Sequence, residues 1–121
     1  MRRHPDPRNL LPMTPIVFQV LLALVDEPRH GYGLIREVAE RTEGLIHLRS
    51  GTLYVLLQRL TDNALIQRTE RDGSDQAART PGSPRRYYGL TAFGRAVLAA
   101  EARRLASAVS DARRKRVLRE R

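Results

Sequence analysis

Polar side chains on one short stretch of the chain have the chemistry to bind phosphate and the edges of DNA bases. Tyr54 offers a rigid ring with one hydroxyl, Gln58 can pair with adenine, and Arg59 can pair with guanine or phosphate. A helix turns by about 100° per residue, which places this face opposite a stripe of leucines. The outward set is Gly51, Tyr54, Val55, Gln58, Arg59 and Asp62, and the inward set is Leu53, Leu56, Leu57 and Leu60. The sequence therefore predicts a helix that packs on its leucines and presents its polar face.

The beginning of this helix has the composition of an anion site. Ser50 is predicted to cap a helix from Gly51 to about Asn63, whose free N–H groups and positive dipole end favour an anion. Gly51 leaves no side chain at the point of closest approach. We therefore expect Arg49, Ser50, Gly51 and Thr52 to lie against a phosphate backbone.

A basic hairpin is expected to follow the helix. Residues 65–72 (LIQRTERD) and 85–90 (RRYYGL) are predicted strands, joined by a polar loop. In a DNA-binding protein such a hairpin, called a wing, can lie along the DNA backbone or insert an arginine into the minor groove. The alternative is a solvated hairpin with ordinary surface charge. The candidate contacts are Arg68, Arg71, Arg79, Arg85 and Arg86. Because Tyr88 is in phase with Leu90, we expect Tyr88 to pack and Tyr87 to stay outside.

Composition limits the class of protein. The 121 residues suit one domain with a modest core, and the formal net charge of +9 favours a polyanionic partner. That partner could be nucleic acid or an anionic membrane surface, and the alternative is a solvated basic surface. No apolar run reaches about 18 residues and prolines interrupt the beginning, so we expect no membrane span, no signal peptide and a cytoplasmic location.

The sequence contains no catalytic or metal-binding set. The absence of cysteine excludes disulfides, thiolate zinc sites and cysteine nucleophiles. His4, His30 and His47 are far apart and have no helical pairing, and no serine nucleophile or carboxylate pair has the partners it needs. We therefore expect no enzyme activity, no cofactor and no metal.

Helices are expected on both sides of this region. Thr14 and Pro15 form a helix start, and the apolar run after them predicts a helix buried on several sides. The elements that follow are a turn over residues 28–33 (PRHGYG), a second helix over 34–42 and a short extended strand over 46–48. Thr91 is predicted to cap the last helix, which runs from Ala92 to about Arg114 or beyond.

The last helix carries an apolar heptad seam. The seam consists of Leu98, Ala102, Leu105, Val109 and Ala112. The predicted helix is too long to pack along its whole length on the core of so small a domain. We therefore favour a helix that packs between two subunits of a homodimer. The alternative is a helix packed on its own domain.

The order of these elements is that of a winged helix-turn-helix. We therefore expect a mainly α fold with a small β-hairpin, in which residues 13–90 form a DNA-binding domain for double-stranded DNA. Residues 1–12 would form a flexible N-terminal arm, and residues 91–121 a C-terminal dimerisation helix with a basic tail.

Four motifs together resemble the PadR family of bacterial transcriptional regulators. They are HGYGLIREV, GTLYVLLQRL, ALI and RRYYGLTAFG, and the resemblance extends from about Met13 to Leu105. It implies a homodimer of the short subfamily that represses transcription from near-palindromic operators. It also implies an apolar or aromatic small-molecule effector, such as a phenolic acid or a drug, that releases the DNA. The residues expected at an effector pocket are Phe18, Val20, Leu21, Phe93, Val97 and Ala100.

Three features depart from the family pattern, and one of them is the long loop over residues 73–84, which is rich in proline and serine. The family often has proline after the tyrosine, where this chain has Val55, and we expect little change from it. The turn after the helix usually contains glycine, where this chain has Asn63 and Ala64. Asparagine tolerates the left-handed conformation, so we expect Asn63 to preserve the turn.

Other functions remain open from the sequence alone. A winged helix can act as a protein-interaction module without specific DNA binding. RNA binding is less favoured, because the exposed aromatic residues are few and have no RNP-like pattern. A regulator of this kind could also activate transcription.

Overall fold

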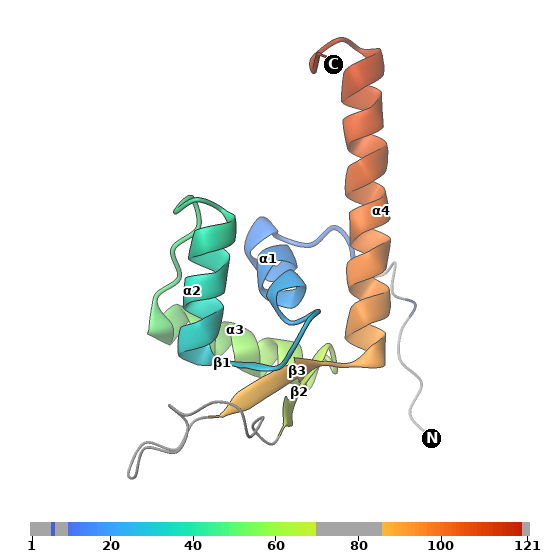
Figure 1. The fold of residues 1–121 in the computed structure, drawn as a ribbon. Coiled ribbons are helices and arrows are strands. Elements are labelled where there is room, and N and C mark those ends of the chain that lie inside the picture. The colour runs from blue at the N-terminus through green and yellow to red at the C-terminus, as the bar shows by residue number, and fades with distance from the viewer. Residues whose placement is uncertain (1–5, 7–9, 70–85, 120–121) are drawn as a thin grey trace.

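The computed structural model describes residue 6 and residues 10–69 and 86–119, which form a small sheet and helices packed beside it (Figure 1). In chain order the elements are α1 (Pro15–Ala23), β1 (Arg29–His30), α2 (Gly31–Arg41), α3 (Ser50–Asp62), β2 (Ile66–Thr69), β3 (Tyr87–Leu90) and α4 (Ala92–Arg114). The predicted fold class is confirmed, because the chain is mainly helical with a winged helix-turn-helix order and an antiparallel wing.

The sheet has one strand more than the predicted hairpin. β3 lies in the middle and pairs antiparallel with β2 on one side and with β1 on the other. The strand predicted at residues 46–48 is wrong, since residues 46–49 are irregular and the additional strand is Arg29–His30. The turn predicted over residues 28–33 is also wrong, because α2 already begins at Gly31. A two-residue strand has no periodicity to detect, and its pairing depends on a partner far along the chain.

Side-chain caps fix the beginnings of three helices. Thr14 Oγ1 accepts a hydrogen bond from Val17 N–H at 3.2 Å, and Thr91 Oγ1 accepts one from Gly94 N–H at 2.8 Å, which confirms both predicted helix starts. His30 Nδ1 accepts from Gly33 N–H at 3.1 Å and caps α2. The predicted cap at Ser50 is wrong, because Ser50 is the first residue of α3 and Arg49 occupies the cap position.

The core lies where the helices meet the sheet. α1 lies between α2 and α4 and contacts both (Figure 1). Three of the four stripe leucines of α3 are buried, and Leu56 is half-buried. The fully buried apolar residues of this core include Val20, Leu21, Leu34, Val38, Leu53, Leu57, Ile66 and Val97. Burial of this leucine stripe fixes which side of α3 faces outward.

The two tyrosines of β3 are both buried. Tyr88 packs into the core as predicted, with 6% of its surface exposed. Tyr87 is only 4% exposed, so the prediction that it stays outside is wrong. Its ring lies edge-on to the His30 ring, with centroids 5.3 Å apart, because β1 pairs with β3 and covers this side of the strand.

The turn after α3 is closed by a left-handed residue. Ala64 N–H donates to Thr61 O and Leu65 N–H donates to Leu60 O, both at 3.0 Å, which is the hydrogen-bond pattern of a Schellman motif. Ala64 has φ +63°, whereas Asn63 has φ −88°. The turn survives without glycine, but Ala64 rather than the predicted Asn63 takes the left-handed conformation, because the motif places it one residue after the helix cap.

α4 is about 35 Å long and extends well beyond the core. Its last buried residue is Glu101, whose carboxylate accepts hydrogen bonds from Arg104 Nε at 2.6 Å and from Met13 N–H at 3.2 Å. The hydrogen bond from Arg104 is the main reason that the pKa of Glu101 is lowered. This carboxylate ties the segment before α1 to the middle of α4.

In the part of the chain that the structure describes, no helix combines the length and the apolar character needed to cross a bilayer.

Candidate DNA interface

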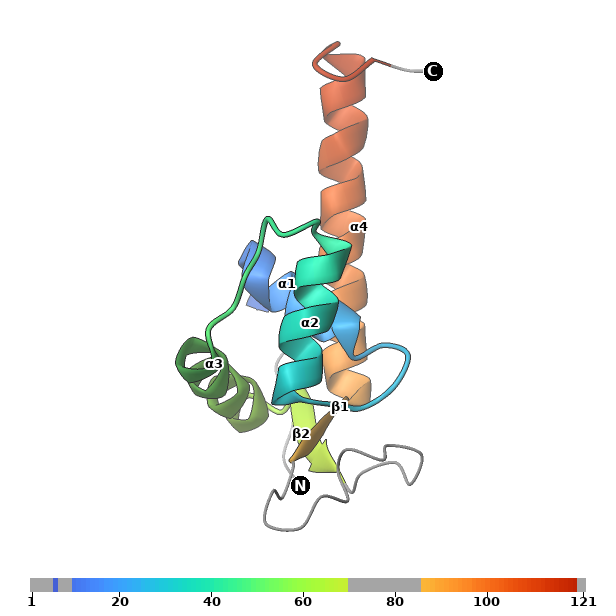
Figure 2. The same ribbon diagram turned by 60° about the vertical axis from the view of Figure 1, so that its left-hand side comes forward.

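All six residues predicted to face outward from α3 are exposed. Tyr54 exposes 55% of its surface and Val55 exposes 65%. α3 lies at the edge of the molecule with one side turned away from the other helices (Figure 2). The face that the sequence assigned to DNA is therefore accessible within one subunit.

The first turn of α3 is open to an external anion. Among the helices of the described chain, α3 is the one without a side-chain cap. Its first hydrogen bond within the backbone joins Leu53 N–H to Arg49 O at 2.9 Å, so the amides before Leu53 have no partner in the helix. The four predicted phosphate contacts at this end, Arg49, Ser50, Gly51 and Thr52, are all exposed. Free N–H groups, the helix dipole and the Arg49 charge make this end electropositive.

Packing within the subunit explains the glycine at position 94 but not the glycine at position 51. A Cβ on Gly94 would lie 1.9 Å from Leu65 O, so α4 can cross the turn after α3 only with glycine at this position. Among the residues that the structure describes, none would lie within 4 Å of a Cβ on Gly51. Packing within the subunit therefore requires glycine at position 94 and does not require it at position 51.

Gln58 is held in place along the exposed face. Its Nε2 donates to Asp62 Oδ1 at 3.0 Å, one turn further along α3. The bond orients the amide of Gln58 and leaves its carbonyl oxygen and one N–H for another partner. Asp62 brings a negative charge to the end of the face, so the first half of α3 is the part suited to phosphate.

An exposed aromatic residue that was not among the predicted contacts lies at the beginning of α2. Tyr32 is 61% exposed, and the Arg36 guanidinium lies 5.9 Å from the centre of its ring. A Cβ on Gly31 would lie 3.5 Å from the Tyr54 hydroxyl, so Tyr54 reaches from α3 to the first residue of α2. Tyr32 belongs to the HGYG motif, but the motif was assigned to a predicted turn over residues 28–33. Tyr32 was therefore not placed on a helix.

The wing is described in part. Arg68 on β2 and Arg86 directly before β3 are exposed, on the pair of strands that lies beside α3. The other predicted wing contacts, Arg71, Arg79 and Arg85, lie outside the described residues, as does the loop over 73–84. The described part of the wing therefore contributes two exposed cations on the strands that follow α3.

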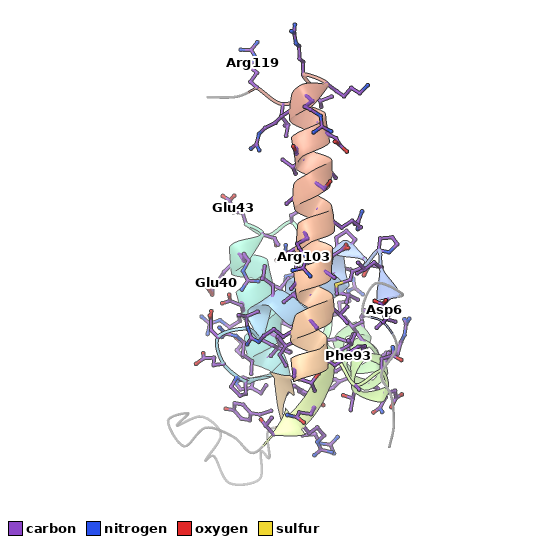
Figure 3. All side chains as sticks on the ribbon, turned by 90° about the vertical axis from the view of Figure 1, so that its right-hand side faces the viewer. Asp6, Glu40, Glu43, Phe93, Arg103 and Arg119 are labelled. Atoms are coloured by element: carbon purple, nitrogen blue, oxygen red, sulfur yellow. The ribbon has the colours of Figure 1, made fainter. Side chains whose placement is uncertain are left out.

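The apolar seam of α4 divides into two parts. Leu98 is 5% exposed and belongs to the core of its own subunit. Ala102 and Val109 are exposed, and Leu105 and Ala112 are half-buried. These four residues lie on the overhanging part of the helix, between Phe93 at its base and Arg119 beyond its far end (Figure 3). Leu105 lies at the same groove as Phe18 of its own subunit, whereas Ala102 and Val109 leave apolar surface exposed on the part of α4 that extends beyond the core.

The structure places the six residues predicted for an effector pocket in different surroundings. Val20 and Leu21 are completely buried in the core, so they offer no surface to a ligand within one subunit. Phe18 lines a groove of about 270 Å³ beside Glu101 and Leu105. Val97 lies at a separate cavity of about 190 Å³ behind α3. Phe93 and Ala100 are half-buried on α4.

The two histidines that the structure describes have separate surroundings. His30 caps α2, His47 is exposed, and His4 lies outside the described residues. Within residues 10–69 and 86–119, no group of three or more histidine or acidic side chains is placed to hold a metal ion.

Known proteins of similar sequence include a family of transcriptional regulators. Residues 20–100 match the Transcriptional regulator PadR-like family. A protein from Lysinibacillus sphaericus, described as uncharacterized, is 32% identical over 79 residues, which cover 65% of this chain and 67% of the relative.

Solved structures share the fold. A PadR family transcription regulator from Clostridium difficile R20291 superposes with a TM-score of 0.67 at 24% identity, covering 84% of this chain and 97% of that one. Bacillus subtilis PadR in complex with operator DNA superposes with a TM-score of 0.58 at 21% identity, covering 74% of this chain and 46% of that one. The family match includes all of α2, α3 and the described strands of the wing. The chain therefore belongs to the PadR-like family of transcriptional regulators.

Proposed function

We propose that the protein is a homodimeric repressor that binds a specific operator in double-stranded DNA. As a member of its family the protein is a transcriptional regulator rather than an enzyme. Each subunit would place Gly51 to Asn63 in a major groove and rest its wing on the flanking backbone. Two recognition helices related by a two-fold axis would read half-sites about 34 Å apart.

The open first turn of α3 is the observation that carries this proposal. The turn combines uncapped amides, an exposed Arg49 and a glycine that no contact within the subunit requires. A helix end of this kind stabilises an anion, and the outward face behind it carries Tyr54, Gln58 and Arg59 for contacts in the groove. Bacillus subtilis PadR, which shares the fold, has been solved in complex with operator DNA.

The overhang of α4 supports the proposed dimer. Ala102, Leu105, Val109 and Ala112 form an apolar stripe beyond the core, and a second α4 would cover it. In this arrangement residues 13–90 act as the DNA-binding domain and residues 91–121 as the dimerisation helix with its basic tail. An apolar effector would bind where α1 meets the partner's α4, near Phe18, and would release the DNA by changing the distance between the two recognition helices.

Footprinting on the promoter upstream of the protein's own gene tests the proposal. We expect two protected half-sites of near-palindromic sequence, with centres about 10 base pairs or a multiple of that apart. The affinity should fall steeply with salt, because each arginine that binds phosphate releases counterions. Binding without sequence preference, or protection of a single half-site by a monomer, would contradict the proposal.

A further inference from the structure

Val55 is an exposed apolar residue in the middle of the outward face of α3. It exposes 65% of its surface, more than its neighbour Tyr54. Gly51, Val55, Gln58 and Asp62 follow one another at helical spacing and form the central row of this face. Valine is a weaker helix former than alanine or leucine, and this side chain is not buried against any residue that the structure describes. Neither helix propensity nor packing explains a valine at this position.

The neighbours of Val55 leave its methyl groups unobstructed. Gly51, one turn earlier, has no side chain and open space around it. Gln58, on the next turn, is directed along the helix toward Asp62 by its hydrogen bond of 3.0 Å. An apolar group at the centre of a polar row therefore faces whatever surface α3 approaches, with no larger side chain in front of it.

We propose that Val55 recognises the 5-methyl group of a thymine in each half-site. This inference rests on the proposed function, in which α3 enters the major groove. Of the four unmodified bases, only thymine displays a methyl group there, and an apolar side chain discriminates it by van der Waals contact and by removing water from both groups. Val55 is thus a specificity-determining residue, whereas the uncapped turn before it supplies affinity that does not depend on sequence.

Replacement of thymine by uracil tests this contact, because uracil keeps every hydrogen-bonding group and lacks only the methyl. The operator is first selected from random DNA duplexes with the full-length protein. Thymines are then replaced by uracil one at a time in one half-site, and the dissociation constants are measured. We expect one position at which uracil weakens binding about fourfold, the effect of one buried methyl group.

The same measurements with Val55→Ala identify the side chain that makes the contact. At the sensitive position, the Val55→Ala protein should bind the thymine operator about fourfold more weakly, and its ratio of affinities for thymine over uracil should be smaller, because the shorter side chain makes less contact with the methyl group. Val117→Ala is the matched control, because Val117 is 75% exposed and lies after the far end of α4. It should retain the full preference for thymine.

Three results separate the inference from the proposed function. If no uracil substitution weakens binding, or if Val55→Ala keeps the same ratio between thymine and uracil, then Val55 does not read the methyl group and the inference is overturned. If no specific operator can be selected at all, the proposed function fails, and the inference fails with it.

Discussion

At the scale of single residues, we expect glycine at position 51 to be needed for DNA binding but not for folding. An added methyl group meets nothing within the subunit, and alanine is a better helix former than glycine by up to about 1 kcal/mol. Gly51→Ala should therefore leave the unfolding midpoint unchanged or raise it, while it weakens operator binding by holding the first turn away from the DNA. Unfolding curves and dissociation constants measured on the same preparation check both parts. Unchanged operator affinity would show that the backbone at position 51 does not approach DNA.

Ala64 holds a conformation that alanine adopts at a cost. A left-handed φ of +63° destabilises a residue with a Cβ by about 1–2 kcal/mol, and glycine avoids this cost. Glycine also increases the conformational entropy of the unfolded chain, which offsets part of the gain in stability. We expect Ala64→Gly to stabilise the protein by about 0.5–1 kcal/mol, measured by urea unfolding at one protein concentration.

Asn63→Gly is the matched control for this prediction. Asn63 has φ −88°, so glycine gains nothing there and should destabilise the protein by a few tenths of a kcal/mol or more. Equal effects of the two substitutions would contradict the assignment of the left-handed residue to Ala64.

At the scale of elements, the junction between α3 and α4 depends on Gly94. Leu65 O accepts hydrogen bonds from Thr91 N–H and from Thr91 Oγ1, each at 3.1 Å, and Gly94 lies against the same carbonyl. A methyl group 1.9 Å from this backbone atom cannot be accommodated by a side-chain rotation. Gly94→Ala should therefore destabilise the protein by about 3 kcal/mol or more, measured by thermal unfolding. The same substitution at Gly51 is the control, and a stable Gly94→Ala protein would mean that α4 crosses elsewhere.

The elements that the sequence predicted correctly are those with a strong local signal. The leucine stripe of α3 gave the outward face, and the capping threonines gave the starts of α1 and α4. β1 and the beginning of α2 could not be predicted in this way, because two residues have no periodicity and their pairing depends on β3, more than fifty residues later. The burial of Tyr87 depended on the same pairing, so alternation along β3 alone misplaced it. For the same reason, Tyr32 was not predicted to lie on a helix.

At the scale of the whole molecule, the overhanging half of α4 should decide between monomer and dimer. Val109 is 39% exposed and lies outside the core of the subunit, and glutamate is a good helix former. Val109→Glu should therefore leave each subunit folded while it places a charge in the apolar interface, where an unpaired charge is costly. Light scattering should show a dimer for the native protein and a monomer for the variant. Since a monomer reaches one half-site at a time, operator affinity should fall about a hundredfold.

Ser110→Glu is the matched control, because it adds the same charge to the next residue of α4, which is turned away from the seam. It should remain a dimer with native operator affinity. Helical content, measured by circular dichroism, should be the same for the two variants at a concentration where both are folded. If Val109→Glu also remains a dimer with full affinity, the seam on α4 is not the interface, and the two recognition helices must be held at their spacing by another surface.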